Sequence, residues 1–313
     1  MPRAPLYAVV ALLAAVALPS AMAAPKSEER VLVVLASAGS KPYTVADVQR
    51  TLAQANAFFE RSSFGQVHLR TDVTPWLTAF TQSPGCGGAT DHSLDGIFGA
   101  ARTAARRAGY DTTSYDDVVY ALGDNHCGFF GTTVGHDVML MKEPTVQLLV
   151  HELGHTFGLG HAHGADCIDL LRCALEDTGD TLSPMGSGSL DFSAYEKSLL
   201  GWIPGQPHVT APKRYVLVPP TAPSRLAQAL VVETNRGTWW IEYRSKPFRG
   251  VLFRFVDSSF HSAPYDPSAI LILKPTKANR PWIVQGESYR IPYSWRVTLT
   301  RATSTRAELR FRP

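Results

Sequence analysis

Several features that are typical of particular protein classes are missing from this sequence. Charged residues make up only 18% of the 313 residues, too few for a disordered chain, and the apolar share of 45% suffices to bury a core. No run of lysine and arginine stands out, and we interpret the net charge of +3 as thinly spread. A nucleic-acid partner therefore has little support. No strong internal repeat is present either, so the length predicts one large or two ordinary domains.

The apolar run at the start of the chain is too short to cross a membrane. Arg3 precedes a run from Leu6 to Leu18, and the small residues "AMA" follow at residues 21–23. A membrane-spanning helix needs about 20 apolar residues, whereas this layout is typical of a secretory signal peptide. We expect residues 1–23 to be removed and the protein to be exported, secreted or periplasmic, without stable membrane insertion. An uncleaved anchor is the alternative.

Cysteine is scarce, and the four cysteines are not spaced as the ligands of a zinc ribbon are. The residues are Cys86, Cys127, Cys167 and Cys173, and no pair has Cys-x-x-Cys spacing. An even count in an exported protein favours two disulfide bonds. We expect Cys167 to pair with Cys173 and Cys86 with Cys127, with reduced buried thiols as the alternative.

Strand-like and helix-like segments alternate over the first half of the chain. Short apolar or alternating runs predict four strands, at residues 31–36, 66–73, 116–122 and 136–141. Apolar residues spaced three and four apart predict two helices, over residues 44–62 and 94–108, with Gly109 ending the second. The expected fold class is α+β, and the strand at 136–141 is a candidate sheet edge.

The composition and the apolar pattern of the sequence change after Trp202. A segment with three prolines follows, at Pro204, Pro207 and Pro212, and is typical of a domain boundary. Beyond it, short β-type runs recur with glycine and proline between them and without a helical period. We therefore expect one domain over residues 24–204 and a second, all-β and sandwich-like, over residues 205–313.

The stretch "HELGHTFGLGHAHG" at residues 151–164 crowds four histidines, one acid and four glycines together. His151 and His155 lie outside the apolar stripe of a predicted helix, whose first turn can hold Pro144. They stand one turn apart, so both imidazoles can bind one metal ion. Glu152 is rotated about 100° from His151. It is a poor ligand there, but it can take a proton from a metal-bound water.

Glycine supplies the second half of this arrangement. Gly158 can adopt the left-handed conformation that ends the helix, so that the chain turns back and His161 becomes the third ligand. Three histidines leave one position open, as in a catalytic zinc site. The spacing H-E-x-x-H-x-x-G-x-x-H is the metzincin signature, which a methionine turn follows. Met185 in "SPMG" is the candidate methionine, with an ordinary core methionine as the alternative.

Three weaker hypotheses concern the surroundings of this site. His163 is interpreted as a surface or outer-sphere histidine, or alternatively as a ligand in place of His161. Trp239 and Trp240 point to opposite faces of a strand, so one at most is expected to be exposed. A group of nearby acids can hold Ca²⁺, although a solvated acidic loop is the favoured interpretation. These acids are Asp166, Asp169, Glu176, Asp177 and Asp180.

With these residues in view, the chain resembles the gametolysin-type metzincin metallopeptidases. The stretches that carry the resemblance are "YDDVVYALGDNHCGFFG", "HELGHTFGLGHAHGADC" and "SPMGSGSLDFSAYEKSLLGWIP", within residues 31–204. The resemblance implies a twisted mixed sheet above a cleft, with the helix of His151 and His155 below it. It implies a secreted zinc endopeptidase that cuts proteins or peptides, with Zn²⁺ on three histidines and Glu152 as the base.

The chain also departs from the family pattern. Some metzincins carry a tyrosine two residues after the turn methionine, where this chain has Ser187; Tyr195 is a candidate substitute, and core packing is the alternative. Two other functions stay open. One is an exported zinc hydrolase that acts on cell-wall peptide amides. The other is a catalytically idle binding protein that uses the β domain. The sequence gives no oligomeric state.

Overall fold

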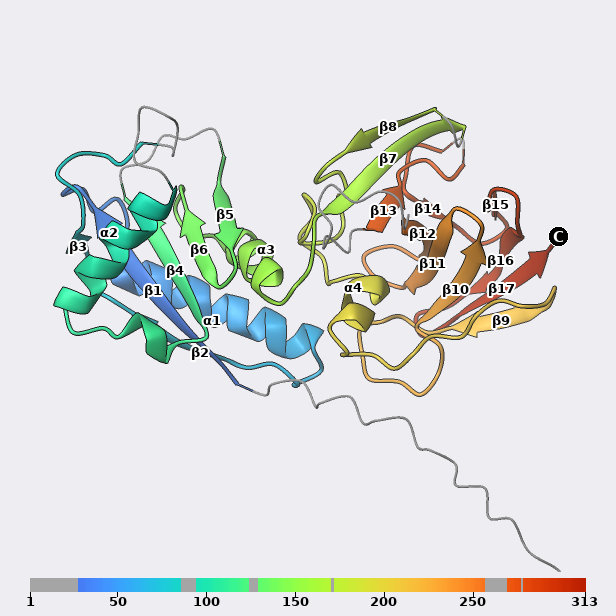
Figure 1. The fold of residues 1–313 in the computed structure, drawn as a ribbon. Coiled ribbons are helices and arrows are strands. Elements are labelled where there is room, and N and C mark those ends of the chain that lie inside the picture. Colours follow the sequence, from blue (N-terminus) through green and yellow to red (C-terminus); the bar gives the residue numbers. More distant parts are fainter. Residues whose placement is uncertain (1–27, 86–93, 124–128, 170–171, 257–268, 277) are drawn as a thin grey trace, which may run out of the picture.

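The computed structural model describes residues 28–85, 94–123, 129–169, 172–256, 269–276 and 278–313. The expected signal peptide at 1–23, as well as Cys86 and Cys127, lie outside these residues. Within them the fold combines helices with three β-sheets, which agrees with the α+β class (Figure 1). No helix in this part of the chain has the length and apolar character needed to cross a bilayer.

The first sheet is mixed and has the strand order β2-β1-β4-β6-β5, with β3 also paired to β1. Its strands are β1 (Glu29–Ser37), β2 (Leu69–Val73), β3 (Leu77–Thr78), β4 (Asp117–Leu122), β5 (Gly131–Val134) and β6 (Asp137–Leu140). Five of them run parallel, and β5 is antiparallel to β6. All four strands that the sequence predicted in this region are therefore present.

The edge of this sheet differs from the expectation. β6 pairs with β4 on one side and with β5 on the other, so the strand within 136–141 is an interior strand. Its residues Val138, Met139 and Leu140 are fully buried, as an interior strand requires. The edge strand is β5, whose sequence "GTTV" lacks the apolar pattern by which strands are recognised.

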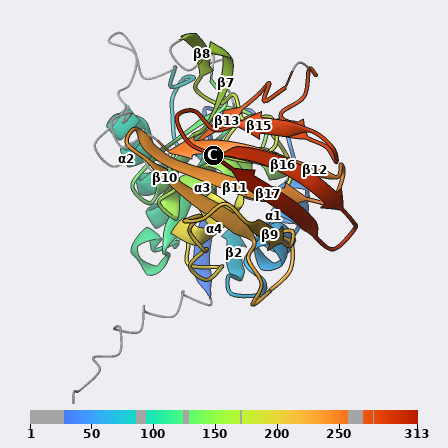
Figure 2. The same ribbon diagram turned by 90° about the vertical axis from the view of Figure 1, so that its right-hand side faces the viewer.

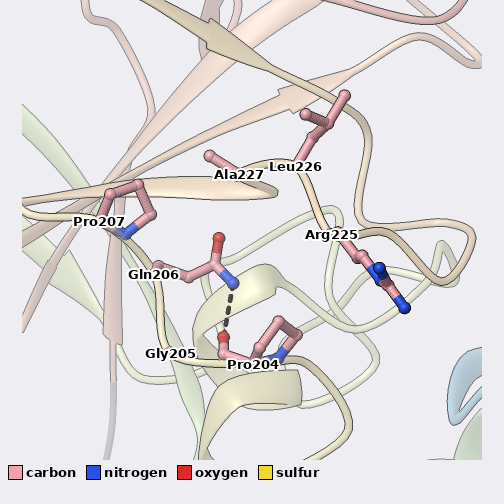
Figure 3. Close-up of a pocket in the computed structure, with 7 residues that line it drawn as sticks. All are labelled: Pro204, Gly205, Gln206, Pro207, Arg225, Leu226 and Ala227. Carbon is pink, nitrogen blue, oxygen red and sulfur yellow. Dashed lines mark hydrogen bonds between the residues drawn. The ribbon is translucent and has the colours of Figure 1, made fainter.

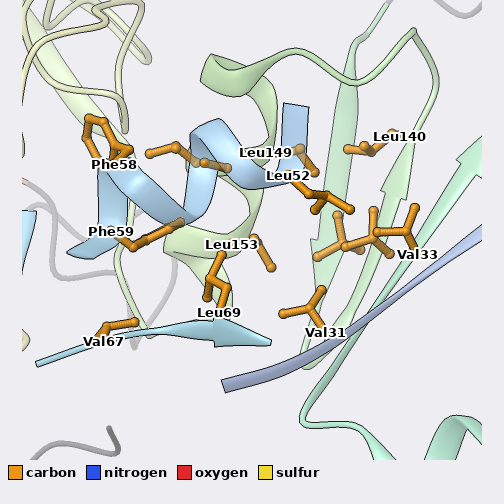
Figure 4. Packing of buried hydrophobic residues seen from close by; sticks show 14 of the residues in the cluster. Val31, Val33, Leu52, Phe58, Phe59, Val67, Leu69, Leu140, Leu149 and Leu153 are labelled. Carbon is orange, nitrogen blue, oxygen red and sulfur yellow. The ribbon is translucent and has the colours of Figure 1, made fainter. Parts of the chain in front are cut away.

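Helices cover both faces of the first sheet. The helices are α1 (Val45–Ser62), α2 (Leu94–Arg107), α3 (Val146–Thr156) and α4 (Ala194–Leu199), with a short 3₁₀ turn at Thr112–Ser114. Alternate residues of β1 point to opposite sides. Val31 and Val33 pack with α1 and α3 (Figure 4), whereas Leu32 packs with α2. Leu149 and Leu153 of α3 lie in the first of these two cores, which fixes the helix against the sheet.

Polar side chains set the start of the two helices on that side. Thr44 and Asp47 form a capping box at the start of α1, in which each side chain bonds the other residue's backbone. Thr145 caps α3, because its hydroxyl accepts a hydrogen bond from the N–H of Leu148. Pro144 therefore precedes the cap, where its missing N–H costs nothing, and does not lie in the first turn as the sequence suggested.

The remaining strands form two further sheets. The larger has the order β10-β11-β12-β13-β7-β8, with β14 paired to β12, and the smaller has the order β15-β16-β17-β9. Their strands are β7 (Ala162–Asp169), β8 (Arg172–Glu176), β9 (Arg214–Leu217), β10 (Ala229–Thr234), β11 (Gly237–Arg244), β12 (Gly250–Val256), β13 (Ala269–Ile272), β14 (Trp282–Ile283), β15 (Ser288–Arg290), β16 (Arg296–Ala302) and β17 (Ala307–Arg312). Apolar residues of both sheets, such as Ile241, Phe253, Leu299 and Phe311, share one core.

Hydrogen bonding crosses the expected domain boundary at residue 204. The hairpin β7–β8 lies directly after the histidine-rich stretch, yet β7 pairs in parallel with β13, more than 100 residues later. Cys167 and Cys173 are backbone partners in this hairpin, although their side chains lie outside the described part. The larger sheet therefore contains strands from before and after residue 204. The division into two domains at that residue stays a prediction.

The side-chain amide of Gln206 holds the segment that follows residue 204 in place. Gln206 donates from Nε2 to the carbonyl oxygen of Pro204 at 2.6 Å (Figure 3). Its Oε1 accepts from the N–H groups of Gln228 and Ala229. An open pocket of about 310 Å³ lies beside it. No histidine lines this pocket, so it is separate from the site described below.

Candidate metal centre

Local structure brings the three predicted ligands together. His151 and His155 lie one turn apart on α3, on the side away from the buried Leu149 and Leu153. Gly158 follows the helix with φ of +90°, in the left-handed region that was predicted for it. The N–H of Leu159 closes this turn on the carbonyl of Gly154, and the chain then returns with His161.

The three imidazoles converge on one point. His151, His155 and His161 each offer one nitrogen, and these nitrogens all lie within 4.8 Å of one another. The Nε2 atoms of His151 and His155 are 3.2 Å apart. No other group of three potential ligands meets the same criterion in the described ranges of the chain.

The outer nitrogen of each imidazole already has an acceptor. Nδ1 of His151 lies 2.8 Å from the carbonyl oxygen of Pro184, and Nδ1 of His155 lies 2.8 Å from that of Leu159. Nδ1 of His161 lies 2.9 Å from Oδ2 of Asp177. Each Nδ1 therefore carries the hydrogen and leaves Nε2 as a lone-pair donor, which is the usual arrangement around histidine metal ligands.

This donor set fits zinc. Lone pairs on two Nε2 atoms at 3.2 Å repel each other unless a cation lies between them. With zinc–nitrogen distances of about 2.0–2.1 Å, tetrahedral ligand nitrogens stand about 3.3 Å apart. Burial also lowers the pKa of His151, which keeps its imidazole neutral and able to bind a metal.

Glu152 lies beside the ligands and is not one of them. Its side chain is buried, with 4% exposure, and Thr133 Oγ1 donates to its Oε2 at 2.7 Å. Burial raises the pKa of Glu152, and the bond from Thr133 opposes that rise. Thr133 belongs to the edge strand β5, and a Cβ at Gly131 in the same strand would lie 2.5 Å from Oε1 of Glu152. The edge strand thus passes directly over the carboxylate.

Met185 lies against the helix that carries the ligands. It is fully buried, and a Cβ at Gly154 would lie 2.3 Å from its sulfur. Glycine at position 154 therefore lets the methionine approach the backbone between the two helix histidines. The carbonyl of Met185 also accepts from the N–H of Ala162, immediately after His161.

His163 was interpreted as a surface or outer-sphere histidine, and its burial excludes the surface position. Its exposure is 5%, because it lies on β7 within the larger sheet. Its Nδ1 lies 3.2 Å from Oδ1 of Asp177 without hydrogen-bond alignment, so Asp177 contacts both His161 and His163. His161, and not His163, belongs to the converging group. From the sequence, Asp177 was expected in a solvated acidic loop, with calcium binding as the alternative.

The acids considered for Ca²⁺ have different partners. Asp166 pairs with Lys274, Asp177 contacts the two histidines, and Asp180 is fully buried against Arg254. Glu176 is exposed, and the side chain of Asp169 lies outside the described part. Calcium binding stays an untested prediction.

A buried arginine from the C-terminal sheet holds the segment that precedes Met185. Arg254 on β12 is 1% exposed and donates from Nε and Nη2 to Oδ2 of Asp180 at 3.0 and 2.8 Å. The other oxygen of Asp180 accepts from the N–H groups of Leu182 and Ser183. Ser183 Oγ in turn donates to Oε1 of Glu196 at 2.6 Å. This segment then supplies the carbonyl of Pro184 that orients His151.

A second acid balances the same arginine. Nη1 of Arg254 lies 2.9 Å from Oε1 of Glu242, although not aligned for a hydrogen bond, and Arg244 Nε donates to that oxygen at 2.8 Å. Burial alone would raise the pKa of Glu242, but the two guanidinium groups outweigh it and lower the pKa to about 2. Burial alone would lower the pKa of Arg254, and Asp180 and Glu242 raise it instead.

Tyr195 was the candidate for a further polar contact at the site, with core packing as the alternative. The ring of Tyr195 is buried and packs on Trp240 at 5.3 Å between centroids, which favours core packing. Trp239 is buried in the core between the sheets, whereas Trp240 is partly buried against α4, so the two indoles differ as expected from their opposite faces. Ser187 is tied through its backbone, since its carbonyl accepts from Gln147.

Comparison with known proteins adds no assignment. No model of a protein family matches the chain, and no curated protein matches it. The resemblance to gametolysin-type metzincins therefore depends on the sequence motif and on the geometry of the three histidines, Glu152 and Met185.

Proposed function

We propose that the protein is a zinc-dependent endopeptidase of the gametolysin-type metzincin kind. The observation that carries this proposal is the convergence of three Nε2 donors beside a buried carboxylate, with every Nδ1 already bonded elsewhere. His151, His155 and His161 would hold the ion. A structural zinc site closes all four positions with protein ligands, whereas three ligands leave one position for reaction.

The residues around the ion have separate tasks in hydrolysis. When bound, zinc supplies a Lewis acid that lowers the pKa of a water molecule and polarises the scissile carbonyl. Glu152 takes the proton of the attacking water and passes it to the leaving amine. Thr133 holds one carboxylate oxygen of Glu152, so that the other is left to receive the proton. The raised pKa of Glu152 suits a group that must both accept and release a proton.

The open side of the edge strand β5 favours an extended peptide segment as the substrate. β5 pairs with β6 only, which leaves its other side open among the described strands. An extended peptide can add to such an edge by main-chain hydrogen bonds, and Glu152 lies directly beneath the strand. Phe130 precedes this strand and Val134 ends it; they are 67% and 53% exposed and favour contact with apolar substrate side chains. Unfolded or flexible protein segments are therefore the proposed substrates, in an exported compartment.

The decisive comparison is between the wild type and Glu152→Gln. Denatured casein is offered to both, and zinc is measured in both by elemental analysis. We expect both proteins to hold about one zinc ion. We expect the variant to be slower by about 10²–10⁴-fold, because the amide cannot accept the proton.

Three other results would count against the proposal. Equal cleavage by the two proteins would remove Glu152 from the mechanism. If both proteins bind zinc and the wild type cuts no protein but releases peptides from cell-wall material, the function would be hydrolysis of cell-wall amides. Zinc in both with neither reaction would favour the idle binding protein.

A further inference from the structure

The charges of the chain are divided unevenly, which corrects the interpretation of a thinly spread net charge. Residues 24–204 contain 12 Lys and Arg against 21 Asp and Glu, a net charge of −9. Residues 205–313 contain 17 Lys and Arg against 6 Asp and Glu, a net charge of +11. An asymmetry of this size makes the basic part the candidate surface for an anionic partner.

Many of these cations share one face of the sheet β15-β16-β17-β9. Its side chains alternate, so that one face packs into the core between the two C-terminal sheets. The opposite face carries Arg301 paired with Glu308, and beside them five further arginines, which we call the arginine face. They are Arg214, Arg290, Arg296, Arg310 and Arg312, of which all but Arg310 are exposed and Arg310 is half-buried.

The strand register places these arginines side by side. Arg290 is paired with Arg296, and Arg296 with Arg312, which makes a row across three strands. Arg310 is paired with Arg214 in a second row. Like charges directly opposite each other destabilise a sheet, so this arrangement has a cost in the free protein.

No acid within the described part of the chain neutralises the arginine face. None of its five arginines has an ion-pair partner among the described residues. Glu308 is the one acid in the four strands, and it lies 3.8 Å from Arg301 instead. The face thus presents uncompensated guanidinium groups to solvent, and a bound anion would relieve their mutual repulsion.

We propose that the arginine face binds a linear anionic polysaccharide. Neighbouring strands are about 4.8 Å apart, so a row presents cations at intervals close to the length of one sugar residue. All five side chains are arginines, whose planar guanidinium groups bind carboxylate, phosphate or sulfate through two parallel hydrogen bonds. A charged group on successive sugars therefore matches the row of Arg290, Arg296 and Arg312.

Other anionic polymers fit this face less well. Proteins that bind single-stranded nucleic acid place aromatic rings among their cations, but here Tyr215, Tyr289 and Phe311 point into the core. The exposed Tyr293 is a lone ring at the end of the row, with Arg236 already over it. A membrane-binding surface adds large apolar side chains to its cations, whereas Val216 is the apolar residue exposed on these strands.

The arginine face lies far from the histidines. Its sheet forms the end of the molecule opposite the first sheet, and β16 and β17 face the viewer in Figure 2 (Figures 1 and 2). A polysaccharide bound there leaves the edge strand β5 and the candidate metal centre open. The C-terminal part would then anchor the protein on an anionic matrix while the site stays accessible.

Binding of the full chain to heparin, as a sulfated polysaccharide, tests the proposal. The variant Arg296→Gln/Arg310→Gln/Arg312→Gln removes three cations of the face. The control Arg225→Gln/Lys246→Gln/Arg249→Gln removes three exposed cations elsewhere in the C-terminal part. We expect the first to lose affinity by about tenfold or more and the control to lose much less. Because repulsion is relieved, the Tm of the first variant should equal or exceed that of the wild type.

Neutral dextran, single-stranded DNA and vesicles with anionic lipid complete the experiment. Heparin binding that exceeds all three and depends on the three arginines supports the proposal. Equal heparin affinity of the face variant and the wild type would overturn it. So would equal losses in the two variants, since net charge alone would then explain binding. DNA or vesicles that bind more tightly than heparin through the same arginines would assign the face to a different polymer.

Discussion

The N-terminal part of the molecule (residues 24–204) and the C-terminal part (residues 205–313) contribute to the candidate site in different ways. In the N-terminal part, α3 and the turn at Gly158 present all three histidines and Glu152 within eleven residues of sequence. In the C-terminal part, Arg254 reaches the same site from 74 residues beyond Asp180 and never touches a ligand. The ligands and Glu152 can be recognised in the sequence because they are neighbours, whereas the contact of Arg254 with Asp180 becomes known only from the fold.

The two parts also differ in how they hold charge. The N-terminal part is acidic overall, and its buried charged side chains are mostly acids, such as Asp117, Glu152 and Asp180. The C-terminal part is basic overall and buries Arg254, Arg244 and Glu242 in one network. Buried ion pairs contribute little net stability, but losing one partner leaves an uncompensated charge. The C-terminal network therefore makes the site sensitive to residues that take no part in the reaction.

The largest expected effect comes from breaking this network at Arg254. Arg254→Met leaves Asp180 buried without its cation, which should destabilise the protein by about 3–5 kcal/mol. Because the segment before Met185 loses its anchor, the carbonyl of Pro184 should shift and zinc affinity should fall by about tenfold or more. Denaturant unfolding and a zinc titration against a chelator measure the two effects.

Arg244→Met is the matched control for Arg254. Arg244 is equally buried and bonds Glu242, but its other partners are the carbonyls of Asp191 and Phe192. We expect a loss of stability without a loss of zinc affinity. Should the Arg254 variant not fold, Asp180→Asn/Arg254→Met removes both charges together. Equal zinc affinity in all these proteins would contradict the role of Arg254.

A change of pH tests the same network through Glu242. Its pKa in the folded protein is about 2, against 4.5 for the ordinary group. A lowered folded-state pKa means that the carboxylate contributes stability above pH 4.5 and loses that contribution as the pH falls towards 2. The contribution amounts to about 3 kcal/mol. The difference in unfolding free energy between the wild type and Glu242→Gln, measured from pH 5 to 2, should shrink with falling pH; a constant difference would exclude the shift.

A smaller effect is expected where the N-terminal part packs on Met185. In Gly154→Ala the new methyl group would collide with the methionine sulfur, at a cost of about 1–3 kcal/mol. Gly99→Ala in α2 is the control, because a Cβ there meets nothing within 4 Å and should stabilise the helix by about 0.5–1 kcal/mol. Thermal unfolding measures both, and equal shifts of Tm would mean that Met185 does not constrain the helix.

Local patterns explain how much of this molecule could be predicted. The helix period revealed α1, α2 and α3, and glycine chemistry correctly predicted the left-handed turn at Gly158. The convergence of His151, His155 and His161 followed from their spacing on that helix and turn. Each of these features depends on residues within a few turns of one another.

Features that depend on distant pairing were missed. The edge strand β5 has no apolar pattern, so only its pairing with β6 reveals it. Asp180 looked like part of a solvated acidic loop, and its burial follows from the β12 strand that lies over it. One signal was available: Arg254 interrupts the apolar run "VLFRF", and an arginine in a buried strand requires an anionic partner.

The central claim is that His151, His155 and His161 form one metal site, and a zinc titration tests it most directly. The purified protein, stripped of metal, is titrated with zinc in competition with a chromophoric chelator, beside His161→Ala. We predict about one tightly bound zinc ion per chain and a loss of affinity in the variant, since one of three ligands is removed. A wild-type protein that binds no zinc, or that binds it equally without His161, would contradict the claim.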